Sequence, residues 1–127
     1  MAVSTEFSLR LPNSPGALAA ICNVLAEERV SIHAFVLGVD GVVRFVVDNP
    51  VRTEGALRAR GQQYRTREVL AVSVGHAPGG VSTVARLLAD AGVNVNYAYG
   101  AAGEASARGT VILAVDDPLR VATAAGL

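Results

Sequence analysis

The 127-residue chain predicts an α+β fold in which one β-α-β-β-α-β unit is used twice, and three observations lead to this prediction. The segment at residues 7–16 (FSLRLPNSPG) returns at residues 70–79 (LAVSVGHAPG), shifted by 63 positions. From the pair Gly41 and Gly109 onward the shift is 68, which places five additional residues in one loop of the second copy. Strand-like and helix-like patterns also follow one another in the same order in both copies. A long internal repeat indicates one supersecondary unit used twice.

The first repeat opens with a strand that leads through a turn into a helix. Apolar and polar side chains alternate over residues 7–11, which predicts a strand with one buried face. The turn at residues 13–16 (NSPG) contains a proline that prepares the start of a helix. Leu18, Ile21 and Leu25 then recur at helical spacing, so we expect this helix to cover the sheet.

The rest of the first repeat adds three strands and a second helix. A second strand begins near Val30, and a two-residue hairpin turn at Asp40–Gly41 joins it to a third strand at residues 42–47. An Asp-Asn-Pro sequence then begins a helix that Gly61 ends. A weaker fourth strand is predicted at residues 63–67. This order of elements is the split β-α-β arrangement of ferredoxin-like folds.

The second repeat follows the same pattern, so we place the repeats at residues 1–68 and 69–127. Its first helix is predicted from apolar residues at helical spacing, namely Val81, Val84 and Leu88. Its middle strands are expected at residues 93–100 and 109–115, and the small residues between them are not expected to hold one shape.

The second repeat is expected to lack its own fourth strand, because the sequence ends at Leu127 just after a helix. Residues 70–74 would then form an exposed strand edge that readily pairs with another chain. Either residues 63–69 are rearranged to cover an edge, or a second copy of the chain covers it. Because 51% of the residues are hydrophobic, we expect a homodimer.

The composition excludes several classes of function. The chain has 11 basic and 11 acidic residues and no basic stripe, so binding to DNA or RNA has little to act on. Cys22 is the single cysteine, which excludes an internal disulfide and predicts a small buried side chain. The start of the chain resembles no signal peptide, and no long apolar run is present. We expect a cytoplasmic protein with no metal, no cofactor and no membrane partner.

The turns and the sequence that follows them resemble the ACT domain. Asn-x-Pro-Gly at residues 13–16 and His-x-Pro-Gly at residues 76–79 each lie between a strand and a helix, and Gly-Val-Asn at residues 92–94 precedes a strand. Such modules sense amino acids in phosphoglycerate dehydrogenases, aspartate kinases and acetolactate synthase regulatory subunits. The resemblance covers nearly the whole chain twice and is similar to small stand-alone tandem ACT proteins.

The resemblance implies which residues bind the ligand. In ACT domains the loop after the first strand wraps the ligand, which typically lies between two domains and is held partly by the neighbour's second strand. The implied residues form two crevices: Asn13, Ser14, Pro15, Gly16 and Ser31 in the first, and His76, Ala77, Pro78, Gly79 and Asn94 in the second. N–H groups at a helix start suit a carboxylate, and Asn or Ser oxygens suit an ammonium, so a free amino acid is the expected ligand.

Simpler structural roles are open for several of these residues. Asn13 and Ser14 can cap the helix that follows them. Asn94 can serve as a turn residue before its strand. His33 lies among apolar strand neighbours, which favours a structural role with its hydrogen bonds satisfied.

We therefore expect a non-catalytic sensor that binds an amino acid and acts in trans, for example on a metabolic enzyme. One alternative is a small enzyme, although the sequence offers no paired carboxylates, Ser-His-Asp set or cofactor loop. An RNA-binding module is rejected because such modules display several aromatic and basic residues on their central strands, whereas residues 43–47 (VRFVV) and 111–115 (VILAV) are mostly aliphatic. The other alternative is a structural assembly module that binds no small molecule. Tyr97 and Tyr99 share one strand face, which favours a place in the core or an interface and leaves open a ligand wall at the domain interface.

Overall fold

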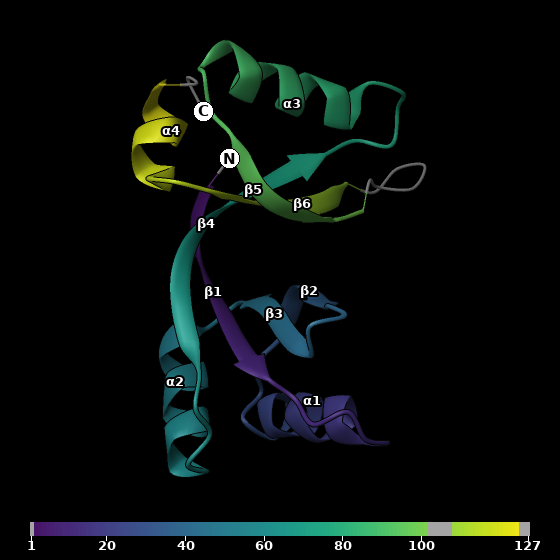
Figure 1. The fold of residues 1–127 in the computed structure, drawn as a ribbon, viewed down its shortest axis with the longest axis vertical. Helices are drawn as coiled ribbons and strands as arrows, with labels where there is room; N and C mark the ends of the chain where they lie inside the picture. Colours follow the sequence, from purple (N-terminus) through teal and green to yellow (C-terminus); the bar gives the residue numbers. More distant parts are fainter. Residues whose placement is uncertain (1, 102–107, 125–127) are drawn as a thin grey trace. The chain divides into compact units, whose positions relative to one another are not determined.

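The computed structural model describes residues 2–101 and 108–124. The chain divides into two compact units, a first unit of Thr5–Arg67 and a second unit of Met1–Ser4 together with Glu68–Leu127. The helices and strands, labelled in Figure 1, are β1 (Ala2–Arg10), α1 (Ala17–Glu27), β2 (Ile32–Leu37), β3 (Val42–Val47), α2 (Pro50–Ala59), β4 (Arg65–Val74), α3 (Gly80–Asp90), β5 (Val95–Gly100), β6 (Gly109–Val115) and α4 (Pro118–Ala124).

The first unit is a sheet covered on one face by α1 and α2. Its strands lie in the order β2-β3-β1-β4, and β3 runs antiparallel to both β1 and β2. Phe7 and Phe45 lie opposite each other in β1 and β3, with ring centroids 5.7 Å apart. Ile21 and Leu25 from α1 and Leu57 from α2 pack onto these rings in one core. This is the α+β arrangement of a ferredoxin-like fold that the sequence predicts.

The local signals of the first unit are confirmed with one exception. Asn49 caps α2, where its side chain accepts a hydrogen bond from the Arg52 N–H at 3.0 Å. Gly61, with φ +65°, follows the end of α2 as expected. The prediction of a two-residue hairpin turn is wrong, because the four residues 38–41 connect β2 to β3 and are closed by a Gly41 N–H to Gly38 C=O bond of 3.1 Å.

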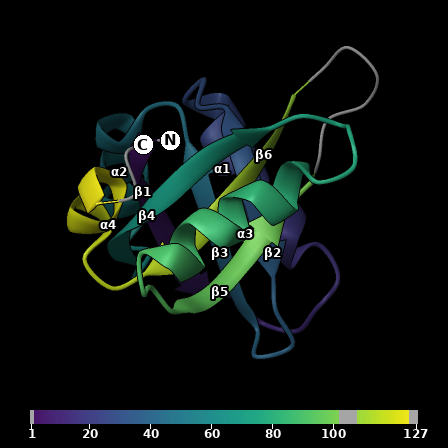
Figure 2. The same ribbon diagram turned by 90° about the horizontal axis from the view of Figure 1, so that it is seen from above.

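The second unit repeats this plan with α3 and α4 (Figure 2). Strands β4 and β5 both run antiparallel to β6. The core combines Leu70 and Val72 from β4, Leu88 from α3 and Val121 from α4. Val81 differs from the prediction: it lies in the first turn of α3 and is 50% exposed, so the packing of this helix rests on Val84 and Leu88. The small-residue loop of this repeat falls mostly on residues 102–107, outside the described residues.

The fourth strand of the second unit comes from the start of the chain. Strand β1 begins at Ala2, earlier than expected, and its first residues belong to the second unit. In the sheet β4 lies between β1 and β6, and Val3 packs against the second core. The expectation that residues 70–74 form an exposed edge is therefore wrong. A strand distant in sequence covers the edge, in place of residues 63–69 or a second copy of the chain.

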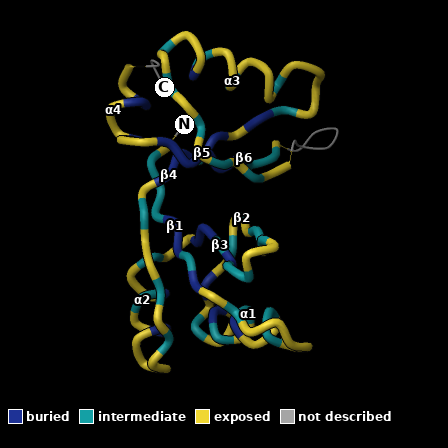
Figure 3. Tube along the Cα trace, viewed as in Figure 1, coloured by how far each residue is buried: buried dark blue, intermediate teal, exposed yellow. Residues whose placement is uncertain are grey.

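Burial follows these two cores (Figure 3). The fully buried side chains lie mainly on β1, β3, β4 and β6, while the outer faces of α1 and α2 are exposed. Among the described residues, Glu6 and Thr53 are the buried polar ones, and the Thr53 hydroxyl donates to the Asn49 carbonyl at 2.9 Å. No helix in the described part of the chain combines the length and the apolar character that a membrane crossing requires.

Candidate functional site

The loop between β1 and α1 is shaped by its backbone. The Ser14 N–H donates to the Pro12 carbonyl at 2.9 Å, and the Ala17 N–H donates to the Ser14 carbonyl at 3.3 Å. The N-cap residue of α1 is Gly16, with φ +84°, and no side chain caps the helix. The capping alternative for Asn13 and Ser14 is therefore wrong. Both side chains are exposed, so they are accessible to a ligand.

The matching loop of the second unit has the same geometry. Gly79 is the N-cap of α3 with φ +91°, and the Gly80 N–H donates to the Ala77 carbonyl at 3.2 Å. Residues 76–79 are exposed, as are residues 13–16. A positive φ gives both Gly16 and Gly79 a conformational reason to be glycine. The closer approach of a ligand to these two backbones stays a prediction.

A cavity of about 560 Å³ lies within the first unit, between this loop and the β2–β3 hairpin. Asn13, Ser14 and Gly16 line it from the loop, and Pro15 does not. The opposite wall is the hairpin, residues 37–41, and Arg10 closes one side. Of the residues predicted for the first crevice, the structure thus brings together three.

Opposite charges face this cavity, which we call the hairpin pocket. The Arg10 Nη1 atom donates to the Asp40 carbonyl at 2.6 Å, and the Asp40 carboxylate lies 3.5 Å from Arg44 Nη2. The pKa of Asp40 is lowered, first by the hydrogen bond from the Val42 N–H at 3.1 Å and then by Arg44, so this exposed carboxyl is ionised at neutral pH. The sequence reasoning treated Asp40 only as a turn residue and did not use Arg10. The predicted order of elements could have suggested that Arg10 and Asp40 lie close together, since the end of β1 and the β2–β3 hairpin lie at the same end of this fold.

Ser31 lies far from the loop at residues 13–16, although both were predicted to line the first crevice. Strands β1 and β2 are both antiparallel to β3, so the loop after β1 adjoins the end of β2, whereas Ser31 precedes its start. Six residues of strand separate the two positions, which is about 20 Å. Ser31 instead pairs with Asp48 through its backbone, at 3.0 Å and 3.1 Å.

Asn94 is separated from its loop for the same reason. It precedes β5, and the loop of residues 75–79 adjoins the other end of that strand. The hairpin that faces this loop contains residues 102–107, which lie outside the described residues. The second crevice as a binding site therefore stays a prediction, and within one unit Asn94 cannot contribute to it.

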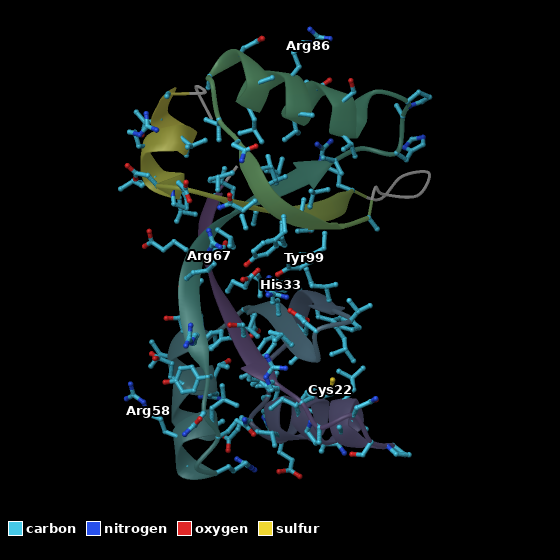
Figure 4. All side chains as sticks on the ribbon, viewed as in Figure 1. Cys22, His33, Arg58, Arg67, Arg86 and Tyr99 are labelled. Atoms are coloured by element: carbon cyan, nitrogen blue, oxygen red, sulfur yellow. The ribbon has the colours of Figure 1, made fainter. Side chains whose placement is uncertain are left out.

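The remaining candidates have varied environments (Figure 4). His33 is exposed on β2, and its expected structural role stays a prediction. Cys22 is half-buried on α1 beside the first core, close to the predicted small buried side chain. Tyr97 and Tyr99 are half-buried on β5. No three His, Cys, Asp or Glu side chains come together as a metal site within the described ranges.

Comparison with solved structures shows the fold of nearly the whole chain. The protein BT0572 of Bacteroides thetaiotaomicron superposes with a TM-score of 0.84 at 23% identity, covering 96% of this chain and 85% of that one. The ligand-free regulatory subunit of aspartate kinase from Thermus thermophilus has a TM-score of 0.68 at 22% identity, covering 98% and 89%. The corresponding subunit from Thermus flavus has a TM-score of 0.65 at 23% identity, covering 97% and 87%.

Comparison with sequence families identifies part of the chain. No curated protein sequence matches it. The family model of the ACT domain matches residues 5–62, nearly all of the first unit and both walls of the hairpin pocket. Residues 5–62 of the chain therefore match the ACT domain.

Proposed function

We propose that this protein is a non-catalytic sensor that binds a free amino acid in the hairpin pocket and regulates a metabolic enzyme in trans. The observation that carries the proposal is that the Arg10 guanidinium and the ionised Asp40 carboxylate both line one cavity, beside the loop that opens the ACT domain. Solved proteins with this fold include regulatory subunits of aspartate kinase.

The pocket offers partners for both charges of a zwitterion. Leu18 and Ala19 line it from the first turn of α1, where backbone N–H groups have no partner within the helix. Together with Arg10, these groups suit the α-carboxylate. The Asp40 carboxylate and the Asn13 side-chain oxygen suit the α-ammonium.

We also propose that a second ACT-type repeat occupies residues 69–127 and that the chain forms a homodimer. Because β4 is not an edge strand, we place the dimer interface at β2, which is the edge strand of the first unit. Its neighbourhood exposes three large apolar side chains, with Phe35 54%, Leu37 44% and Val39 111% exposed. An unpaired strand edge with such side chains is typical of an interface between chains. The resemblance implies that the ligand lies between two ACT domains. In such a dimer, a neighbouring domain would complete the binding site.

The test is calorimetry against the twenty amino acids, with light scattering on the same samples. We expect one or more amino acids to bind and the particle mass to be about twice 13.0 kDa. Replacing Asp40→Asn should weaken binding about 10-fold or more, because the ammonium loses its counter-charge. The matched control is Asp90→Asn, an exposed carboxylate at the end of α3, which should leave binding unchanged.

The absence of heat and of thermal stabilisation with every amino acid would exclude the binding proposal. A monomer mass with and without the amino acids would exclude the homodimer separately. Turnover of a substrate by the purified chain alone would instead support the alternative of a small enzyme.

A further inference from the structure

A second cavity, of about 810 Å³, lies within the first unit, away from the loop that opens the ACT domain. It is lined by the end of β1 and the start of β3, and by residues 62–65, which lead from α2 into β4. The hairpin pocket and this cavity share Arg10 in their linings. No predicted site residue lines it, so it requires an explanation of its own.

The strand register brings two arginines together on one wall. Arg10 lies opposite Val42 and Ser8 lies opposite Arg44 in the antiparallel pair of β1 and β3. Side chains two residues apart share one face of a strand, so Arg10 and Arg44 are diagonal neighbours on the same face. The Cβ atoms of such diagonal pairs are about 7–8 Å apart, which allows both guanidinium groups to reach one small ligand.

The charges lining the cavity are all positive. Arg10, Arg44 and Arg65 line it, and its lining contains no aspartate or glutamate. Arg44 pairs with Asp40 of the hairpin, while Arg10 donates to a backbone carbonyl, which carries no full charge. Arg65 is exposed, and the structure gives it no ion pair or hydrogen bond among the described residues. Three guanidinium groups around one cavity repel each other, and a bound anion would remove that repulsion.

The neutral groups of the lining are suitable for an oxygen-rich ligand. The Ser8 hydroxyl and the amides of Gln62 and Gln63 can each donate hydrogen bonds. Guanidinium groups prefer the planar, bidentate recognition of carboxylate and phosphate oxygens. The volume lies in the range of small-molecule sites, and the net charge of zero gives no support to a nucleic acid as the ligand.

We propose that this arginine cavity binds a small organic anion that carries phosphate or carboxylate groups, as a second ligand beside the amino acid. Arg65 is the group to test, because its side chain has no ion pair or hydrogen bond among the described residues and it does not line the hairpin pocket. Arg44 would hold the anion from the sheet, with Arg10 adding positive charge where the two cavities adjoin, and Gln62 and Gln63 would contact it from the segment that leads into β4.

The experiment is a nuclear magnetic resonance titration of the full chain, with amide signals of the folded protein as the readout. Inorganic phosphate and succinate are added separately at constant ionic strength, with sodium chloride as the reference. We expect shifts at residues 8–10, 42–44 and 62–65, and a comparison of the two anions tells phosphate from carboxylate recognition. In Arg65→Gln the dissociation constant should rise about 10-fold.

The matched control is Arg86→Gln, which removes an exposed arginine that points outward from α3 (Figure 4) and should leave the titration unchanged. Equal shifts in chloride, phosphate and succinate would overturn the proposal, as would an equal loss of affinity in both variants. Amino-acid binding is read at residues 13–19 and 37–41, so a failure here is distinguishable from a failure of the proposed function.

Discussion

The two units close their hairpins with arginines that come from opposite sides. In the first unit Arg10, at the end of β1, donates to the carbonyl of Asp40 in the hairpin at 2.6 Å. The matching positions of the second unit are Ser73 and Arg108, and there the hairpin arginine donates to the Ser73 hydroxyl at 2.7 Å and its carbonyl at 2.9 Å. Both units therefore have a hydrogen bond between the strand end and the hairpin, but the donor lies on the strand in the first unit and on the hairpin in the second. At this matched pair of positions the first unit therefore has the carboxylate of Asp40, where the second unit has the guanidinium of Arg108.

The ends of α1 and α3 give a second comparison. Arg29 and Gly92 occupy the same place after these helices, with φ +57° and +71°. In both, the next residue donates back to the helix, from Val30 N–H to Leu25 C=O and from Val93 N–H to Leu88 C=O, each at 2.9 Å. The closing motif is therefore the same, although one copy places arginine where the other has the glycine that a left-handed backbone favours.

The largest expected effect on stability concerns the fourth strand of each unit. In the first unit this strand follows directly in the sequence, whereas in the second unit it comes from residues 2–4. Val3→Asp should lower the free energy of unfolding by about 2 kcal/mol, because a carboxylate enters the edge of the second core. Urea denaturation measures the loss, and amide hydrogen exchange should rise first in α3, β4 and β6.

The control for this prediction is Val51→Asp, because Val51 on α2 is 81% exposed and lines neither cavity. It should change the stability by less than about 0.5 kcal/mol. Equal effects of the two variants, or faster exchange confined to residues 5–67, would show that residues 2–4 do not complete the second unit.

A smaller effect is expected from exchanging the residues after α1 and α3. Arg29→Gly should stabilise the protein by about 0.5 kcal/mol, since relief of the left-handed strain exceeds the added entropy of the unfolded chain. Gly92→Arg should destabilise it by about 1 kcal/mol. Urea midpoints at constant slope measure both changes. Two changes of the same sign would contradict the equivalence of the two positions.

The smallest expected effect is the pH dependence of the first hairpin, in which Asp40 titrates at the position that Arg108 occupies in the second. The pKa of Asp40 is below its ordinary value of 3.8 because the Val42 N–H donates to the carboxylate. Its stabilising contribution is thus present above pH 3.8 and is lost as the pH falls through the lowered folded value. The Val42 amide signal should titrate with a midpoint below 3.8, and Asp40→Asn should abolish that titration. A midpoint at or above 3.8 would contradict the hydrogen bond as the cause.

Features that depend on neighbouring residues could be predicted from the sequence. The buried face of α1 at Ile21 and Leu25, and the capped start of α2 at Asn49, are where their patterns place them. These signals depend on helical spacing and on a single capping side chain, both of which are local. The repeated motif also predicted the loops whose glycines, Gly16 and Gly79, have a positive φ.

Features that depend on pairing between distant segments were missed. Ala2–Ser4 carries too short an alternation to be recognised as a strand, and its partner begins more than sixty positions later. Ser31 and Asn94 were assigned to their loops by analogy, while the direction of the strands places them at the opposite ends. The hydrogen bond from Arg10 to the Asp40 carbonyl likewise joins the end of β1 to a hairpin loop about thirty residues later in the sequence.

The divided second unit has a consequence for biosynthesis. Residues 5–67 are contiguous and can fold as soon as they leave the ribosome, whereas residues 2–4 leave first and find their partner strand only after residue 68. At translation rates of about 5–20 residues per second, this strand waits for roughly 3 to 13 seconds. During that time it is a strand of the nascent chain without its partner. A change at residues 2–4 that hinders their pairing would therefore impair the second unit, although most of that unit lies more than sixty residues away in the sequence.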